Sequence, residues 1–102
     1  MYIMPKIRIP KPVEFEWDSY NLLKNWIKHH ISQKESEEVF FNTPIDLYPD
    51  RIHSQSEKRN VAYGHTDNNK KLTIIFTLRA QKIRIISTRP MSHKERRQYE
   101  KN

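Results

Sequence analysis

The chain has 102 residues, with 19 Lys and Arg against 12 Asp and Glu, so its formal net charge is +7. This length corresponds to a single domain, and the lack of cysteine excludes disulfides, thiol nucleophiles and cysteine-based zinc sites. The excess positive charge indicates a polyanionic or acidic partner, with simple solubility as the alternative explanation. No apolar run approaches the roughly 18 residues of a membrane span, and the start lacks a secretory leader. We therefore expect a cytoplasmic protein that does not contact the membrane.

The N-terminal region is rich in proline. Pro5, Pro10 and Pro12 resist helix formation and remove backbone donors. The pattern predicts an extended arm or an edge segment over residues 1–14, followed by a single domain over 15–102.

Three helices are predicted from capping residues and apolar spacing. Asp18 can cap a helix over 19–29, and its apolar stripe is expected to face the core: Leu22, Leu23, Trp26, Ile27 and His30. Lys24, Asn25 and Lys28 fall away from this stripe. Ser32 with Glu35 and Ser92 with Glu95 form capping boxes, which predict a second helix ending before Pro44 and a third over about 92–101.

Strand-like runs are predicted at 59–65, 71–79 and 82–88, with a possible short strand at 45–48. An even-length turn after Arg79 pairs Arg79 with Lys82, Thr77 with Arg84, Phe76 with Ile85 and Ile74 with Ser87. One face of this hairpin is then apolar, and the other carries Thr77, Arg79, Lys82 and Arg84. The predicted class is α+β, with two N-terminal helices packed on a three- to four-stranded antiparallel sheet and a C-terminal helix.

Several kinds of catalytic site are excluded by composition. Gly64 is the only glycine, so the chain has no glycine-rich phosphate loop and no nucleophile elbow. The histidines lack the spacing of metal ligands, and we expect neither a metal nor a cofactor.

The densest group of reactive side chains spans 53–59. RNA can be cut without a metal when one group takes the 2′-hydroxyl proton, another protonates the leaving oxygen, and cations stabilise the phosphate. His53 or Glu57 can move protons, and four arginines can hold the phosphate: Arg59, Arg79, Arg84 and Arg89. The alternative is a turn at His53 and a surface ion pair of Glu57 with Arg59 or Arg79. Tyr48, Tyr63 and Tyr99 can stack on bases, but each is equally suited to packing.

Three stretches resemble the signatures of the BrnT toxin family, in order and with compatible spacing over about 15–99. They are Phe15–Asp18 with Asn25, Lys28, His29 and Ile31; then His53, Ser54, Glu57, Arg59 and Gly64; then Arg84–Arg89 with Glu95, Arg96 and Tyr99. His30 departs from the family, which usually has glycine there. A left-handed residue at this position would be strained.

The resemblance implies an endoribonuclease toxin of a type II toxin–antitoxin pair with a RelE-like fold. It also implies a ribbon-helix-helix antitoxin as partner, RNA as substrate, and contact with DNA only through the antitoxin. The candidate catalytic residues are His53, Glu57, Arg59, Arg79 and Arg84, and the candidate RNA-binding residues are Lys28, His29, Lys82 and Arg89. The alternative is a degenerate toxin, a basic module that binds RNA or antitoxin without cutting.

Overall fold

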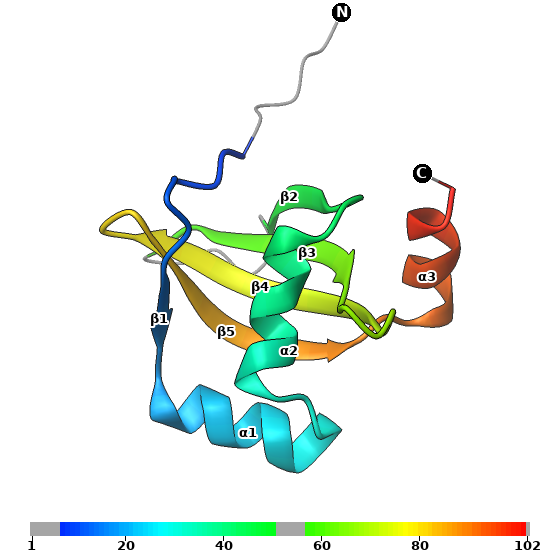
Figure 1. The fold of residues 1–102 in the computed structure, drawn as a ribbon, viewed down its shortest axis with the longest axis horizontal. Helices are drawn as coiled ribbons and strands as arrows, with labels where there is room; N and C mark the ends of the chain where they lie inside the picture. The colour runs from blue at the N-terminus through cyan, green and yellow to red at the C-terminus, as the bar shows by residue number, and fades with distance from the viewer. Residues whose placement is uncertain (1–6, 51–56, 102) are drawn as a thin grey trace, which may run out of the picture.

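The structure, a computed structural model, describes residues 7–50 and 57–101 (Figure 1). In chain order its elements are β1 (Phe15–Trp17), α1 (Ser19–His29), α2 (Gln33–Glu38), the 3-10 turn η1 (Val39–Phe41), β2 (Asp46–Asp50), β3 (Arg59–His65), β4 (Lys71–Arg79), β5 (Lys82–Pro90) and α3 (His93–Tyr99). None of the helices in these two ranges is long and apolar enough to cross a membrane.

The strands form one mixed sheet in the order β1-β5-β4-β3-β2. The α+β class is confirmed, but the predicted three- to four-stranded antiparallel sheet is wrong, because β1 adds a fifth strand parallel to β5. Phe15 pairs with Ile83, and the Glu14 carbonyl accepts a hydrogen bond of 2.9 Å from the Ile83 amide. A strand of three residues is too short to show an alternating pattern, so only this long-range pairing defines it.

The β4–β5 hairpin follows the predicted pairing close to its turn. Arg79 pairs with Lys82, and Ala80 and Gln81 both take positive φ values, 52° and 67°, as a tight two-residue turn requires. Beyond Phe76 the predicted register is wrong, because a bulge between Ile75 and Phe76 shifts the pairing. Ile74 therefore faces Thr88 instead of Ser87.

The bulge decides which side chains of β5 reach each face. Thr88 is fully buried on the side of the core, whereas Ser87 and Arg89 lie opposite Ile75 and Thr73 and face the other side. The far end of β5 thus contributes polar groups to the uncovered face of the sheet.

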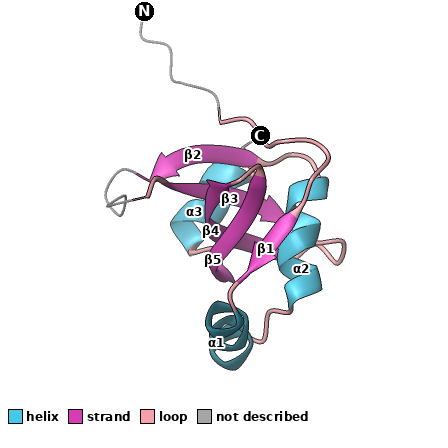
Figure 2. Ribbon diagram, turned by 90° about the vertical axis from the view of Figure 1, so that its left-hand side faces the viewer, coloured by secondary structure: helices cyan, strands magenta, loops and turns pink. Residues whose placement is uncertain are grey.

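The predicted apolar face of the hairpin is confirmed as the core. Its buried members are Leu72, Ile74, Phe76, Ile83 and Ile85. The segment of α2 and η1 covers this face, with the Phe40 ring 5.2 Å from that of Phe76 in an edge contact (Figure 2). Gly64 lets β3 approach η1, because a Cβ there would lie 2.6 Å from Val39 Cγ1. Ile7, Ile9 and Val13, from the predicted N-terminal arm, also pack against the core.

Helix α1 has the predicted bounds, and Asp18 caps it by accepting from the Tyr20 and Asn21 amides. Its predicted orientation is wrong, because Leu23, Trp26 and Ile27 are exposed and Asn25 is the buried residue. The sheet face is already covered by α2 and the N-terminal residues. Helix α1 instead lies along the β5 side, and Asn25 Oδ1 accepts a hydrogen bond of 3.1 Å from the Thr88 amide (Figure 1).

Both predicted capping boxes are present. The Ser32 and Ser92 hydroxyls accept from the amides of Glu35 and Glu95, and each glutamate accepts in return from the serine amide. Helix α3 lies on the opposite side of the sheet from α2 (Figure 2). It thereby closes one end of the face that α2 leaves open.

Candidate functional site

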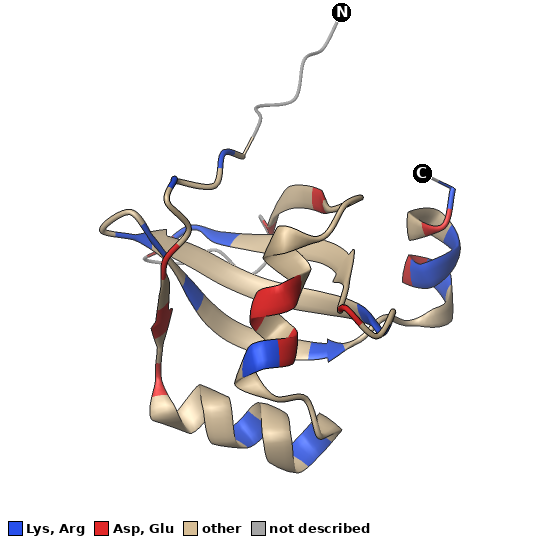
Figure 3. Ribbon diagram, viewed as in Figure 1, with Lys and Arg blue, Asp and Glu red and all other residues tan. Residues whose placement is uncertain are grey.

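The face of the sheet opposite α2, here called the open face, contains a hollow of about 420 Å³. This central hollow is lined by Lys24, Asp50, Arg59, Val61, Tyr63, Thr73, Ile75, Ile86, Ser87 and Arg89. Its cationic residues come from α1, β3 and β5, and Figure 3 shows Lys and Arg at both ends of β5. Segments distant in sequence therefore bring three cations and one carboxylate, that of Asp50, to the same cavity.

Arg59, Val61 and Tyr63 reach the central hollow because alternate residues of a strand point to the same face. Thr73 and Ile75 do the same from β4, and Ser87 and Arg89 follow on β5 after the bulge. Strand alternation and the β5 bulge thus explain why these side chains all point into the central hollow.

Arg89 is fixed at the rim of the hollow by Glu95 of α3. The guanidinium donates two hydrogen bonds, from Nη1 to Oε1 at 2.7 Å and from Nη2 to Oε2 at 2.8 Å. Thr73 Oγ1 and the Ser92 amide also donate to this carboxylate, at 3.0 and 2.9 Å. These donors, Arg89 foremost, lower the pKa of Glu95 to about 2, and the same pair raises the pKa of Arg89. Arg89 is therefore oriented before any ligand arrives.

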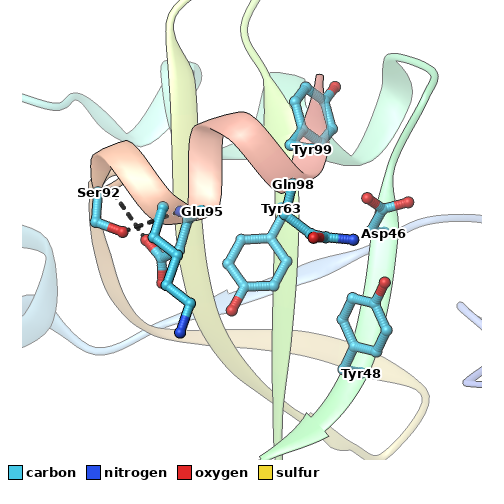
Figure 4. A pocket seen from close by; sticks show the side chains of 8 residues that line it. Asp46, Tyr48, Tyr63, Ser92, Glu95, Gln98 and Tyr99 are labelled. Atoms are coloured by element: carbon cyan, nitrogen blue, oxygen red, sulfur yellow. Dashed lines mark hydrogen bonds between the residues drawn. The ribbon is translucent and has the colours of Figure 1, made fainter. Parts of the chain in front are cut away.

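A second cavity of about 470 Å³, here called the tyrosine hollow, lies between α3 and strands β2 and β3 (Figure 4). It is lined by Asp46, Tyr48, Tyr63, Ser92, Lys94, Glu95, Gln98 and Tyr99. The rings of Tyr48 and Tyr63 are tilted, with centroids 6.0 Å apart. Burial, and then the charge of Glu95, raise the pKa of Tyr63, so its phenol stays protonated. Tyr63 lines both hollows and joins them.

Tyr99 anchors the wall of the tyrosine hollow. Its hydroxyl donates to the Pro44 carbonyl at 2.6 Å and lies 2.8 Å from His65 Nδ1. Because a phenol has one proton, His65 Nδ1–H is the donor in the second contact. The two bonds tie α3 to β3 and to the segment before β2.

A group of charges lies at the hairpin end of the open face. Arg79 donates to Glu57 in a two-bond ion pair, from Nε at 3.0 Å and from Nη2 at 2.9 Å, and both side chains are exposed. The surface ion pair expected as the alternative role of Glu57 is therefore present. The hydrogen bonds from Arg79 lower the pKa of Glu57, and the charges of Arg84 and Arg59 add to this. As a carboxylate, Glu57 accepts protons and has none to donate.

Arg84 contacts two acidic residues that precede α1. Its Nη2 lies 3.3 Å from Asp18 Oδ2, and its Nη1 lies 3.7 Å from Glu16 Oε1. This arginine links β5 to the residue that caps the helix, so a phosphate at Arg84 competes with two carboxylates.

The remaining predicted residues are dispersed. Lys82 is exposed beside the hairpin turn, and Lys28 is exposed on α1. His29 lines a different hollow, with Lys70 and Arg96. His53 lies outside the described residues.

The structure thus brings Arg59 and Arg89 to one hollow, and groups Glu57, Arg79 and Arg84 at the hairpin end. Sequence reasoning did not select Lys24 or Glu95 as site residues. Lys24 fell outside the apolar stripe of its helix, and Glu95 was identified as part of a capping box and of the family signature. The alternation of Arg59, Val61 and Tyr63 along β3 was the signal that could have placed Tyr63 beside Arg59. Within residues 7–50 and 57–101, no three His, Asp or Glu side chains are grouped as a metal site requires.

Comparison with known proteins identifies the family of this chain. Residues 17–95 match the family described as the ribonuclease toxin BrnT of type II toxin–antitoxin systems. The fold is similar to the crystal structure of the Brucella abortus ribonuclease toxin BrnT, with a TM-score of 0.60 and 19% identity over 79% of this chain and 99% of that chain. A search of curated proteins finds no match. The family match includes every residue that lines the central hollow. The chain therefore belongs to the BrnT family of ribonuclease toxins, each the toxin of a type II toxin–antitoxin system.

Proposed function

We propose that this endoribonuclease binds and cuts single-stranded RNA on the open face of the sheet, and that the cut needs no metal ion. One observation carries the proposal: Lys24, Arg59 and Arg89 line a single hollow although they belong to three separate elements. A phosphate group in that hollow meets two guanidinium groups and one ammonium group, the side chains best suited to bind it, and these three cations outnumber the single carboxylate there, that of Asp50.

Cleavage would begin with attack of the 2′-hydroxyl oxygen on the neighbouring phosphorus. The bond from phosphorus to the 5′ oxygen then breaks, and that oxygen leaves with a proton. The cations of the central hollow stabilise the extra negative charge on the pentacovalent phosphate. Glu57 and His53 stay the sequence-based candidates for the two proton transfers, although the ion pair with Arg79 lowers the pKa of Glu57 and so weakens it as a base.

The nucleobase next to the cleaved phosphate would occupy the tyrosine hollow. Tyr48 and Tyr63 offer two aromatic surfaces there, and bases stack on such surfaces whatever their sequence. Gln98 and Asp46 line the same cavity and can form hydrogen bonds with base edges. Because Tyr63 lines both hollows, a base and its phosphate can be held together.

The outer parts of the RNA would follow the charges at the hairpin end. Arg79, Lys82 and Arg84 lie along that part of the sheet, and Lys28 and His29 are the outermost candidates, at the end of α1. Longer RNA would therefore bind more tightly than a dinucleotide, with an affinity that falls as salt rises.

The family assignment implies an antitoxin partner. We propose, from the resemblance of the sequence motifs, that this antitoxin is a ribbon-helix-helix protein and that the toxin meets DNA only through it. Purification of the pair, followed by binding of operator DNA to the complex and to the toxin alone, tests this point.

The test of the proposed activity is a cleavage time course with purified protein, an end-labelled single-stranded RNA and excess chelator. We expect cleavage to continue in chelator, and Arg59→Ala to slow it about 100-fold, the usual effect of removing a group that stabilises transition-state charge. Lys34→Ala is the matched control, because Lys34 is an exposed cation on α2, across the sheet from the hollow. It should cut like the parent.

Three outcomes would contradict parts of the proposal. Loss of activity in chelator would overturn the metal-free mechanism, and full activity of Arg59→Ala would remove the central hollow as the site. RNA that shifts in a gel but is never shortened would favour the non-catalytic alternative. His53→Ala tests the sequence-based proton-transfer role separately.

A further inference from the structure

One side of α1 exposes a continuous apolar surface. Tyr20, Leu23, Trp26 and Ile27 are exposed by 71%, 58%, 50% and 64%, and this set is here called the α1 apolar face. At its inner edge, an apolar groove of about 330 Å³ is lined by Leu22, Leu23, Trp26 and Ile31, with Ser19, Ser32 and Gln33. Exposed patches of this kind on small proteins mark interaction surfaces.

We propose that the α1 apolar face docks the antitoxin, through an amphipathic antitoxin segment that carries apolar residues beside acidic ones. The type II system supplies a protein that must bind this chain, and charge indicates the chemistry of its contact. Helix α1 has no acidic residue, and Lys24 and Lys28 run one turn apart along the flank of the apolar stripe. Leu and Trp side chains would anchor the segment, and carboxylates would pair with the two lysines.

A second copy of this chain fits the same surface poorly. The chain carries a net charge of +7, and an antiparallel symmetric pairing of two α1 helices would also bring the Lys24 and Lys28 rows of both copies together. Self-association would then add repulsion where an acidic partner adds attraction.

The position of this face also explains how docking would neutralise the toxin. Lys24 lines the central hollow and directly follows Leu23 in the helix, and its ammonium lies 5.8 Å from the centre of the Tyr20 ring. A partner that covers the α1 apolar face therefore reaches the rim of the hollow. This last step rests on the proposed function of the hollow, whereas the docking itself does not.

The experiment produces the chain in cells with and without its cognate antitoxin. We expect the double variant Leu23→Ser/Ile27→Ser to arrest growth like the parent but to escape rescue by the antitoxin. With purified proteins, its dissociation constant should rise about 100-fold, as for loss of a hot spot. Phe41→Ser is the matched control, since Phe41 is an equally exposed aromatic outside α1 and should still be rescued.

Rescue of the double variant as complete as that of the parent would overturn the proposal. So would loss of its toxicity with an unchanged melting temperature, because the face would then serve the RNA reaction. A toxin dimer that forms without antitoxin and is abolished by the double variant would assign the face to a second copy. RNA cleavage by the same proteins is measured separately, so failure of the proposed RNA site leaves the docking result readable.

Discussion

Helices α1 and α3 are tethered to neighbouring residues of β5 at different places: α1 lies along the side of β5, and α3 lies on the open face of the sheet (Figure 2). Helix α1 uses a neutral amide in the buried core, where Asn25 Oδ1 accepts from the Thr88 amide at 3.1 Å. Helix α3 uses an ion pair at the rim of the open face, where Glu95 accepts from Arg89 at 2.7 and 2.8 Å. The bulge in β5 sets the second tether, because it directs the Arg89 side chain to the open face, where it meets Glu95.

The difference shows how a small sheet can hold two helices through polar contacts of different kinds. A tether through one polar residue lets α1 turn Leu23 and Ile27 outward, and a charged tether lets α3 orient Arg89 toward the central hollow. The contribution of the Asn25–Thr88 hydrogen bond to stability should not change with pH. The contribution of the Arg89–Glu95 ion pair should change, because it depends on ionisation of Glu95.

The largest effect on stability is expected from Asn25→Ala. The substitution leaves the buried Thr88 amide without an acceptor and opens a cavity, so the free energy of unfolding should fall by about 2–3 kcal/mol. Urea unfolding at pH 4 and pH 7 should give the same loss. Asn21→Ala, at a half-buried position of the same helix, controls for the helix preference of alanine. If the urea midpoint of Asn25→Ala equals that of the parent, contacts other than the Asn25–Thr88 hydrogen bond hold α1 in place.

Glu95→Gln tests the charged tether. The carboxyl has a pKa of about 2 in the folded protein and about 4.5 when unfolded, so it stabilises the fold above pH 4.5 and loses this effect as the pH falls toward 2. After allowance for its partial exposure, we expect the variant to be less stable by about 2 kcal/mol at pH 7. The two proteins should converge near pH 2.

The control for this pair is Glu100→Gln, since Glu100 forms an exposed ion pair with Arg96 one turn earlier in the same helix. Its stability should follow that of the parent at every pH. A constant difference between Glu95→Gln and the parent from pH 7 to pH 2 would mean that the ion pair does not tether α3.

The smallest effect concerns how the two helices end. Helix α1 ends in the left-handed residue His30, with φ 53° and ψ 37°, whereas α3 ends in Glu100 with φ −71°. His30→Gly should therefore raise the free energy of unfolding by about 0.5–1 kcal/mol, although it removes the contact of His30 with the Trp26 ring. Glu100→Gly should not stabilise. The thermal unfolding midpoints of the two glycine variants are compared with that of the parent. A lower midpoint for His30→Gly would show that the contact of His30 with Trp26 stabilises the protein more than the left-handed backbone of His30 strains it.

The parts of the fold that depend on nearest neighbours were predictable from the sequence. Asp18, Ser32 and Ser92 begin helices because each satisfies free amides within the next three residues. The apolar alternation of β4 and β5 likewise predicted their buried face, because side chains along a strand alternate strictly.

The candidate site was predictable only in part. Arg59 and Arg89 were selected for their chemistry, and the structure places both at the central hollow. Lys24 and Glu95 were not, since they reach the open face only because α1 and α3 dock where they do. Arg79 was selected as a phosphate ligand, and its surface ion pair with Glu57, which the sequence offered as the alternative, is present.

The sequence by itself determined where helices begin, where the hairpin turns, and that positive charge exceeds negative. Tertiary structure decided that β1 joins the sheet, that a bulge redirects Thr88 and Arg89, and that α1 presents its apolar side to solvent. The physical reason is that capping and alternation are satisfied over a few residues. Burial of a helix face instead depends on which surface is still uncovered once the other elements have packed.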